Sequence, residues 1–336
     1  MNKDRIQLAH GSGGKLSHDL IEQVIFPAFS NDILAEMHDG AKISVGGAKL
    51  AFTTDSYVVK PRFFAGGDIG KLAVCGTVND LAMTGAIPLY LSVGLILEEG
   101  FLVSDLSRIL ESMRLAAAEA GVIIVTGDTK VVEKGAVDGI YINTAGIGSV
   151  MAKTDLSPRH VQSGQVVILS GFIGDHAIAV LADRHGLELP QTIVSDCAPL
   201  NGLVEEVLTQ FPRVAVLRDP TRGGVATTLN EIAEQAGVGI LIEEMAVPIR
   251  PEVAAVCDML GFDPLYLANE GKFLLFADEQ DSAGIIALLQ RHAYGQAAKI
   301  IGRVTAAHAG QVCLHTVIGG VRLLDMLVGD QLPRIC

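Results

Sequence analysis

The spacing of apolar residues over the first 150 positions predicts an alternation of helices and strands. Apolar side chains recur with helical periodicity over 17–26, 67–83 and 103–120, and short apolar runs typical of strands cover 50–57, 89–96, 122–125 and 140–148. Ser104 and Gly121 suit the two ends of the third helix. A polar stretch over 151–164 indicates a linker. We therefore predict a first α/β domain over residues 1–150.

The same alternation continues after the linker. Strand-like runs cover 165–170, 214–218, 239–242 and 273–276 and recur near 300 and 312, whereas helical spacing follows Asp175 and covers 200–211, 224–235, 251–260 and 281–292. This predicts a second α/β domain over 165–315 and a mixed α/β (α+β) fold for the chain. Residues 316–336 are a predicted flexible C-terminal tail with no strong element after Leu324; its last dozen residues, fully extended, reach about 35–40 Å.

Composition and charge narrow the classes of partner. Hydrophobic residues make up 49% of the chain but aromatic residues only 5%, so the core is built from small aliphatic side chains. The formal charge of −13 makes the chain a poor candidate for nonspecific binding of nucleic acid or anionic membranes. The N-terminus lacks an apolar signal segment, and the longest apolar stretch, 86–97, is too short to span a bilayer. We expect no nucleic-acid partner and no membrane association.

The five cysteines indicate a reducing, cytoplasmic environment. Their odd number, wide spacing and lack of a Cys-x-x-Cys pair argue against a disulfide framework and a structural zinc site. Four of them lie in apolar surroundings typical of packing thiols: Cys75, Cys197, Cys257 and Cys313. The fifth, Cys336, is the last residue, where a thiol is exposed and reactive. It is either a chemical handle on a movable arm or a frayed end that stops at Cys.

A glycine-rich loop near the N-terminus is the first candidate for phosphate binding. In His10-Gly11-Ser12-Gly13-Gly14-Lys15, backbone N–H groups can approach phosphate oxygens closely. The loop departs from the P-loop pattern because Ala9 takes the place of the first Gly. It departs from the dinucleotide fingerprint because Leu16 takes the place of the third Gly. A flexible leader is the alternative interpretation.

Acidic residues beside Gly, Thr, Asn or Arg are candidates for holding Mg²⁺ over a nucleotide, since hard cations prefer oxygen ligands. These residues are Asp39, Asp55, Asp68, Asp80, Asp128 and Asp219, with Asn79 next to Asp80. Each of them also suits a helix cap or a turn. Lys130 follows Asp128 at a predicted strand end, where functional sites are common.

Two further motifs lie in the second half. Asp219-Pro220-Thr221-Arg222-Gly223-Gly224 leads from a predicted strand into a helix, which is typical of an anion site. In Asn269-Glu270-Gly271-Lys272, the acidic side chain is either a general base or a turn residue, and the residues alone favour the turn.

In this order the motifs resemble the PurM-like ATP-binding superfamily, which includes aminoimidazole ribonucleotide synthetase, selenophosphate synthetase and thiamine-monophosphate kinase. The resemblance covers nearly the whole chain and is closest to the HypE family of carbamoyl dehydratases. It also rests on Thr53-Thr54-Asp55-Ser56-Tyr57, on 70–80, on 126–132 and on the ending Pro333-Arg334-Ile335-Cys336. The ending separates the HypE family from the selenophosphate synthetases, which carry their reactive residue in the N-terminal glycine-rich segment.

The resemblance implies two α/β domains and a homodimer formed by the N-terminal domains. It implies that a carbamoyltransferase, HypF, loads a carbamoyl group on Cys336 and that ATP phosphorylates the carboxamide oxygen. Loss of phosphate then leaves a thiocyanate, and cyanide passes to iron on the HypC–HypD complex. The implied nucleotide ligands are Lys15, Asp39, Asp55, Asp68, Asn79, Asp80, Asp128, Asp219 and Arg222, with Mg²⁺ held by Asp55, Asp80, Asp128 and Asp219.

The chemistry of the residues agrees with this reaction class. Dehydrating a primary amide requires its oxygen to leave as phosphate and a base to take the nitrogen protons, and Glu270 is the candidate base. Lys130 can orient that carboxylate or stabilise developing charge, and a tethered Cys336 makes the reaction intramolecular. Two other functions stay open: a kinase or synthetase with a free small substrate, and a non-catalytic scaffold or metal carrier that presents Cys336 to a partner.

Overall fold

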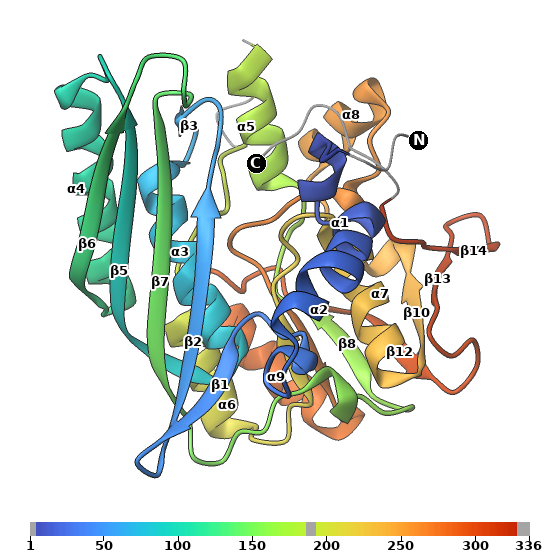
Figure 1. Cartoon of the computed structure of the whole chain (residues 1–336). Coiled ribbons are helices and arrows are strands. Elements are labelled where there is room, and N and C mark those ends of the chain that lie inside the picture. Colours follow the sequence, from blue (N-terminus) through green and yellow to red (C-terminus); the bar gives the residue numbers. More distant parts are fainter. Residues whose placement is uncertain (1–4, 186–192, 328–336) are drawn as a thin grey trace.

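A computed structural model describes residues 5–185 and 193–327 of the chain. Cys336 and the rest of the predicted tail after Leu327 lie outside the described residues. Two β-sheets stand side by side, each covered by helices (Figure 1). The mixed α/β prediction is confirmed.

The first sheet has the strand order β1-β2-β7-β5-β6. All neighbouring strands are antiparallel except β5 and β6, which are parallel. Helices α3 and α4 pack on one face around Leu72, Leu91, Ile109 and Ile142. The bounds are β1 Ala41–Val45, β2 Ala48–Tyr57, β5 Ala86–Glu98, β6 Ile123–Val132, β7 Ile140–Val150, α3 Ile69–Met83 and α4 Val103–Ala120, and a small hairpin adds β3 Phe63–Phe64 and β4 Gly67–Asp68.

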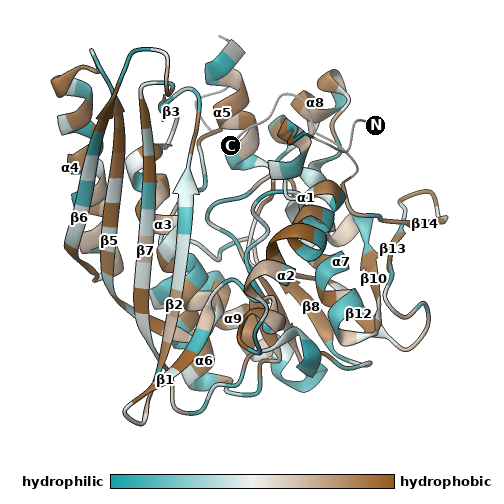
Figure 2. Cartoon of the chain, in the orientation of Figure 1, coloured by the Kyte–Doolittle hydropathy of each residue, from teal (hydrophilic) through white to brown (hydrophobic). Residues whose placement is uncertain are grey.

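The other face of this sheet is open and carries an apolar row. The strand register places Phe52, Ile147, Tyr90 and Ile123 beside one another across four strands. Phe52, Tyr90 and Ile123 are 45%, 46% and 60% exposed, which is unusual for three large apolar side chains in one row. Apolar segments are visible along β5, β6 and β7 (Figure 2). β6 is also an edge strand.

The second sheet has the order β14-β13-β10-β12-β8-β11-β9 and is covered on both faces. Val166 and Ile168 of β8 point to the core that contains α6 and α9, whereas Val167 and Leu169 point to the core that contains α7. The strand bounds are β8 Val166–Leu169, β9 Val216–Arg218, β10 Gly239–Glu243, β11 Leu274–Ala277, β12 Lys299–Thr305, β13 Val312–His315 and β14 Val321–Leu323. The helices are α5 Asp175–His185, α6 Asn201–Gln210, α7 Gly224–Ala236, α8 Pro251–Leu260 and α9 Glu279–Arg291.

The C-terminal end of α3 joins the two halves. Ala82 and Met83 belong to the same buried cluster as Leu203, Leu217 and Leu275 of the second half. The domains therefore share packed apolar surface, so that loops from both can form a single site. In the linker, Leu156 packs against the same cluster.

The helix predicted over 17–26 is divided into short pieces. α1, Lys15–Leu20, is followed by a π-turn over Ile21–Ile25 and by α2, Phe26–Phe29. Single 3₁₀ turns cover Leu8–Gly11, Leu34–Glu36, Pro158–His160, Glu244–Ala246 and Pro264–Tyr266. None of the helices within 5–185 and 193–327 is long and apolar enough to cross a membrane.

The predicted tail begins with residues that the second sheet holds. β14 pairs antiparallel with β13, and Leu324 is buried. The Leu324 carbonyl accepts a hydrogen bond from Asn230 Nδ2 at 2.6 Å, and the Asp325 carbonyl accepts one from the Tyr266 hydroxyl at 2.9 Å. The backbone is thus fixed to the body of the protein as far as the last described residues.

One expectation about strand ends is wrong. The motif at 126–130 lies inside β6, which continues to Val132, and not at the end of a strand. β6 pairs with β5 as far as the couple Glu98–Val132. The polar residues of the motif hid this extension, because an edge strand exposed on both faces does not require an apolar run.

Candidate functional site

Four of the predicted acidic residues meet where the two domains join. Asp39 precedes β1, Asp55 lies in β2, Asp80 lies in α3 and Asp219 follows β9. The Thr53 hydroxyl lies between two of them, 2.9 Å from the Asp39 carbonyl and 3.0 Å from Asp80 Oδ2. We call Asp39, Asp55, Asp80 and Asp219 the acidic cluster.

Two arginines partly compensate the acidic cluster. Arg218 Nε lies 2.7 Å from Asp39 Oδ1, and Arg218 Nη2 lies 2.8 Å from Glu231 Oε2. Arg222 Nη2 lies 4.0 Å from Asp55 Oδ1 at the more exposed side of the cluster. Burial lowers the pKa of Arg218, but its carboxylate partners outweigh this effect and raise that pKa above its ordinary value.

The acidic cluster holds more negative charge than these arginines offset. Burial raises the pKa of Asp80 well above its ordinary value, and the charges of Asp219, Asp39 and Asp55 raise it further. Burial also raises the pKa of Asp219 to about 6, although Arg218 opposes the change. For Asp39, burial raises the pKa and Arg218 again opposes the change. Such an environment favours a bound cation, which would stabilise the ionised carboxylates.

The donor set of the acidic cluster fits Mg²⁺ shared with a phosphate-bearing substrate. Among the described residues, no three His, Cys, Asp or Glu side chains form a group that could hold a metal ion by themselves. Mg²⁺ is commonly held by one or two carboxylates together with substrate phosphates and water. Within the described part of the chain, Asp39 Oδ2 and Arg218 Nη1 are buried without a hydrogen-bond partner. Asp39 Oδ2 can accept a hydrogen bond or bind a cation, and Arg218 Nη1 can donate a hydrogen bond to an anion.

The glycine-rich loop packs directly against the arginine loop and the start of the tail. Gly13 has a φ of +78°, and a Cβ there would lie 2.6 Å from Arg222 Cβ. A Cβ on Gly14 would lie 2.2 Å from the Leu327 carbonyl oxygen, which accepts a hydrogen bond from the Lys15 N–H at 2.9 Å. Any side chain at Gly13 or Gly14 would therefore separate segments that lie more than 200 residues apart in sequence.

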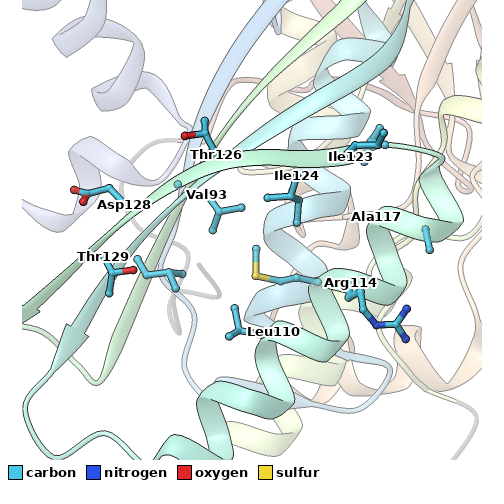
Figure 3. A pocket seen from close by; sticks show the side chains of 14 residues that line it. Val93, Leu110, Arg114, Ala117, Ile123, Ile124, Thr126, Asp128 and Thr129 are labelled. Carbon is cyan, nitrogen blue, oxygen red and sulfur yellow. The ribbon is translucent and has the colours of Figure 1, made fainter.

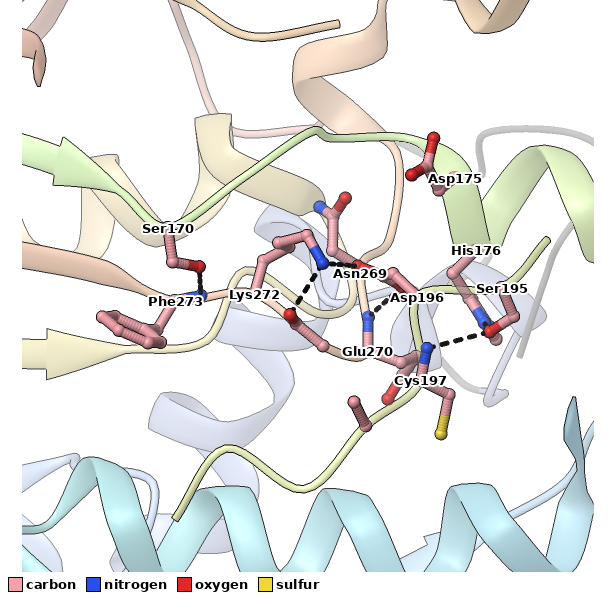
Figure 4. A network of polar contacts seen from close by, with 12 residues as sticks. Ser170, Asp175, His176, Ser195, Asp196, Cys197, Asn269, Glu270, Lys272 and Phe273 are labelled. Atoms are coloured by element: carbon pink, nitrogen blue, oxygen red, sulfur yellow. Dashed lines mark hydrogen bonds and ion pairs between the residues drawn. The ribbon is translucent and has the colours of Figure 1, made fainter. Parts of the chain in front are cut away.

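Glu270 is buried in the loop between the 3₁₀ turn Pro264–Tyr266 and β11, where this loop contacts α3 of the first domain. Burial raises the pKa of its carboxyl well above the ordinary value, and the nearby Cys197, Asp196, Asp219 and Asp55 raise it further. Its side chain is thus influenced both by the acidic cluster and by the segment around Asp196. Figure 4 shows Glu270 beside Asp196 and Cys197. This position, and not that of a surface turn, is what a proton acceptor in a closed site requires.

Asn79 connects this loop to the helix that carries Asp80. Its Nδ2 donates to the carbonyls of Glu270 at 3.2 Å and Ala198 at 3.1 Å, and its Oδ1 accepts from the Leu200 N–H at 2.8 Å. The side-chain amide therefore holds backbone in place. Asp68 has a similar structural position, because its Oδ1 caps α3 by accepting from the N–H groups of Gly70 and Lys71 at 2.7 and 3.1 Å.

Asp128 and Lys130 are not brought to the acidic cluster within one protomer. They lie on β6, where Lys130 Nζ is 3.7 Å from Asp128 Oδ2, and both side chains are more than 70% exposed. The register places Asp128 in a row with Gly94, Asn143 and Ser56, so that three strand spacings, about 14 Å, separate it from β2. Lys15 begins α1, beside Asp325 and Met326.

Several residues at the site carry little or no local signal of their role. Arg218 ends a strand of apolar residues next to Asp219, and a charge in such a strand is a signal of burial with a partner. Lys272 belongs to the 269–272 motif, but its ion pair with Asp196 joins residues that are distant in sequence, so the motif alone does not predict it. Asp196 lies in an irregular segment before α6, and nothing in its neighbourhood distinguishes it from an ordinary loop residue.

Two cavities lie near these residues. One, of about 340 Å³, is lined by polar residues that include Asp175, Asp196, Arg250 and Lys272. The other, of about 680 Å³, lies between β6 and α4 (Figure 3). Its lining is mainly apolar, with Leu110 and Ile124 among the side chains, and it does not reach the acidic cluster.

Comparison with known proteins identifies both domains. Residues 37–150 match the family model of the AIR synthase related protein, N-terminal domain, and residues 162–314 match that of the C-terminal domain. The chain is 50% identical to the carbamoyl dehydratase HypE of Rhodobacter capsulatus over 100% of this chain and 99% of that protein. It is 45% identical to the carbamoyl dehydratase HypE of Escherichia coli K12, over 99% and 100% of the two chains.

Solved structures agree with the sequence comparison. A crystal structure of the HypE–HypF complex contains a chain that is 48% identical, with a TM-score of 0.87 and coverage of 92% of this chain and 99% of that one. A structure of HypE in complex with ATP is also 48% identical, with a TM-score of 0.83 and coverage of 99% and 100%. The family suggested by the motifs is thereby confirmed: this chain belongs to the AIR synthase-related proteins and, among them, to the HypE carbamoyl dehydratases.

Proposed function

We propose that this enzyme uses ATP to dehydrate a carbamoyl group carried on its own Cys336 and so forms a thiocyanate. The thiocyanate would supply the cyanide ligand for the iron of nickel–iron hydrogenase. One observation carries the proposal: the chain is fixed at Leu327 to the glycine-rich loop, which itself packs on Arg222 beside the acidic cluster. The last nine residues, 328–336, therefore start at the site. Fully extended, nine residues span about 30 Å.

The reaction balances when oxygen leaves as phosphate. The carboxamide oxygen of the S-carbamoyl group attacks the γ-phosphorus of ATP, and ADP leaves. Both protons on nitrogen are removed, the second by a base as the C–O bond breaks, and the C≡N bond forms as inorganic phosphate departs with one of the two protons. The products are S-cyano-cysteine, ADP, phosphate and one proton for each carbamoyl group consumed.

Glu270 is the proposed base. Its buried carboxyl lies between the acidic cluster and the Asp196 segment, away from bulk water. The raised pKa makes its carboxylate a stronger proton acceptor than an exposed glutamate. Lys130 would stabilise developing charge, and we assign it to this site only in the assembled dimer.

The acidic cluster would hold Mg-ATP. Asp55, Asp80 and Asp219 are the proposed metal ligands from one protomer and Asp128 from another, with Asp39 and Arg222 beside them. Bound Mg²⁺ would neutralise charge on the phosphates. The support is the hard-oxygen donor set of the acidic cluster and the ATP-bound structure of a HypE relative. The side-chain ammonium group of Lys15 would add a donor for phosphate oxygens, because the Lys15 N–H is already bonded to the Leu327 carbonyl.

A homodimer would cover the open face of the first sheet. The apolar row of Phe52, Ile147, Tyr90 and Ile123 is the surface that we assign to a second copy. The polar row with Asp128 runs along the same face. Because one protomer leaves Asp128 about 14 Å from β2, pairing is the arrangement that could complete the site.

The proposed partners follow from the reaction. HypF, which is seen in complex with a HypE relative, would load Cys336, and the HypC–HypD complex would accept cyanide. Loading needs a free thiol, and the four described cysteines are free and buried. We therefore assign the protein to the reducing cytoplasm.

Intact-protein mass spectrometry tests the proposal. Incubation with HypF and its substrates should add the mass of one carbamoyl group, and Mg-ATP should then remove the mass of one water. Cys336→Ala should fold normally but show neither change, with Cys313→Ala as the matched control that shows both. Modification of Cys75, Cys197, Cys257 or Cys313, or normal thiocyanate formation by Cys336→Ala, would contradict the proposal and favour a kinase with a free substrate.

A further inference from the structure

The side chain of Asp196 contacts the segment that carries Glu270 at two points. Asp196 Oδ1 accepts a hydrogen bond from the Glu270 N–H at 3.1 Å. Its Oδ2 forms an ion pair with Lys272 Nζ at 3.3 Å, and Lys272 Nζ also donates to the Gly271 carbonyl at 2.8 Å. Figure 4 shows these side chains gathered around the 269–272 loop. The Asp196 carboxylate thus holds this loop at two points, the Glu270 N–H and the Lys272 side chain.

The two segments lie so close that the backbone itself is in contact. A Cβ on Gly271 would lie 1.8 Å from the Asp196 carbonyl oxygen, a separation that no side chain at residue 271 can occupy. The Asp196 side chain is 3% exposed and the Lys272 side chain 10% exposed. An ion pair so well shielded from water is a firm constraint, because losing either partner leaves a buried charge without compensation.

The other side of Glu270 is held by Asn79. The Glu270 carbonyl accepts from Asn79 Nδ2, so that side chains from two other segments bind both the N–H and the C=O of this one residue. Glu270 lies in no helix or strand, and main-chain pairing of the usual kind does not fix it. Its position therefore depends on these side chains.

We infer that Asp196, through its hydrogen bond to the Glu270 N–H and its ion pair with Lys272, is a positioning residue that sets the Glu270 carboxylate for proton removal in the dehydration step. This inference rests on the proposed function, in which Glu270 is the base. Asp196 is not assigned to contact ATP or the carbamoyl group. Its effect should fall on the rate of the chemical step and leave carbamoyl loading and nucleotide affinity unchanged.

A second ion pair, in which the Asp175 side chain is 6% exposed and the Arg250 side chain 40% exposed, offers a control. Arg250 Nε lies 2.9 Å from Asp175 Oδ2, and both residues line the same cavity as Asp196 and Lys272. Asp175 makes no described contact with Glu270 or Gly271. If ion pairs in this cavity affected only the stability of the fold, Asp175→Asn and Asp196→Asn would have equivalent effects.

The experiment follows one turnover of HypF-loaded enzyme after addition of saturating Mg-ATP, with the loss of one water read by intact mass. Asp196→Ala should slow this step by about 10²-fold, the effect of a misplacement near 1 Å. Asp196→Asn keeps an oxygen that can accept from the Glu270 N–H, and its rate should recover to within about tenfold of the unmodified enzyme. Lys272→Met should be slow, and Asp175→Asn should be unaffected.

The same variants are measured for ATP affinity and thermal unfolding. Unchanged ATP affinity in Asp196→Asn and Lys272→Met, together with a slow chemical step in Lys272→Met, supports the inference even if Asp196→Ala fails to fold. An unmodified rate in Lys272→Met and in every folded Asp196 variant, while Glu270→Gln is inactive, overturns the inference alone. Equal slowing of Asp175→Asn and Asp196→Asn overturns it as well. Full activity of Glu270→Gln removes the proposed base and with it the function on which the inference rests.

Discussion

Buried carboxylates destabilise a folded protein unless a cation or a hydrogen bond compensates for their charge. Asp80 shows this conflict most clearly, since it accepts one hydrogen bond from Thr53 but is surrounded by three other acids. Residues kept at a cost in stability are a common property of functional sites. The acidic cluster should therefore trade stability in the free enzyme for affinity toward Mg-ATP.

Asp80→Asn should change these two quantities in opposite directions. Without ligand, the free energy of unfolding should rise by about 1 kcal/mol, because a carboxyl whose ionisation the cluster disfavours is replaced by a neutral amide. Mg-ATP affinity should fall about tenfold or more, equivalent to about 1.4 kcal/mol. Denaturant unfolding and isothermal titration calorimetry measure the two effects. Unchanged nucleotide affinity would remove Asp80 from the binding site.

Glu270→Gln should separate binding from chemistry. The variant keeps the size and polarity of the side chain and should still accept the carbamoyl group and bind ATP. Its dehydration rate should fall by about 10²- to 10⁴-fold, which is the usual contribution of general base catalysis. Intact mass after loading and after Mg-ATP shows each step. A normal rate would exclude Glu270 as the base.

His176 makes the free energy of unfolding depend on pH. It is fully buried, its Nδ1 lies 2.8 Å from the Ser195 hydroxyl oxygen, and burial lowers its pKa to about 4. Above about pH 6.5, the pKa of an unfolded histidine, both states are neutral and the term is zero. As the pH falls from 6.5 to 4, only the unfolded chain binds the proton, so stability is lost, by about 3 kcal/mol in all.

The test compares His176→Asn with the unmodified chain. The difference in their free energies of unfolding should be constant from pH 7 to 8 and should change by up to about 3 kcal/mol in favour of the variant as the pH approaches 4. Urea unfolding at several pH values measures it. Parallel pH curves for the two proteins would show that His176 is protonated equally in both states.

At the scale of helices and strands, predictions succeeded where one local signal decides the structure. α4 and α8 have the predicted bounds, because an amphipathic pattern ends at Gly121 and Gly261, which adopt φ values of +70° and +73°. The prediction for β6 is too short because the residues over 126–130 interrupt its apolar run. β1 was missed because it is an edge strand of a hairpin that turns through Gly46 and Gly47.

The candidate site was predictable only in part for a similar reason. Asp55, Asp80 and Asp219 could be named from motifs, since each lies beside Gly, Thr, Asn or Arg in a recognisable string. Glu270 on its own residues resembled a turn, because the contacts that bury it come from Asn79 and Asp196, which are distant in sequence. Asp196 carries no local signal, since its role depends on tertiary contacts.

The open face of the first sheet provides a prediction at the same scale. Ile123→Glu should place a charge in the apolar row and convert a dimer into monomers while each domain stays folded. Leu115→Glu is the matched control, since Leu115 is 55% exposed on α4, which covers the opposite face. Light scattering after size-exclusion chromatography gives the mass. A dimer in both variants would place the interface elsewhere.

At the scale of the whole molecule, the distance between Asp128 and β2 predicts complementation between subunits. If each site takes Glu270 from one copy and Asp128 from the other, Asp128→Asn and Glu270→Gln should each be inactive as homodimers. A mixed dimer has one site with both residues intact and should recover about half of the activity per dimer.

Mixing and exchanging the two purified variants, each loaded by HypF, and measuring thiocyanate formation tests this arrangement. Mixing two separately loaded batches of the same variant serves as the control for dilution and subunit exchange. If the mixture stays as inactive as its components although mass measurements show mixed dimers, Asp128 does not act across the interface.

The hydrogen bond between the Lys15 N–H and the Leu327 carbonyl has a consequence for substrate competition. A terminal residue tethered at that point stays within about 30 Å of it, and such confinement gives an effective concentration on the order of millimolar. A carbamoylated thiol free in the cell would have to reach that concentration before it competed for the same site. The anchor therefore favours the tethered thiol over free thiols without any specific recognition of the thiol. Cyanide formation is thereby restricted to the cysteine of the chain's own tail.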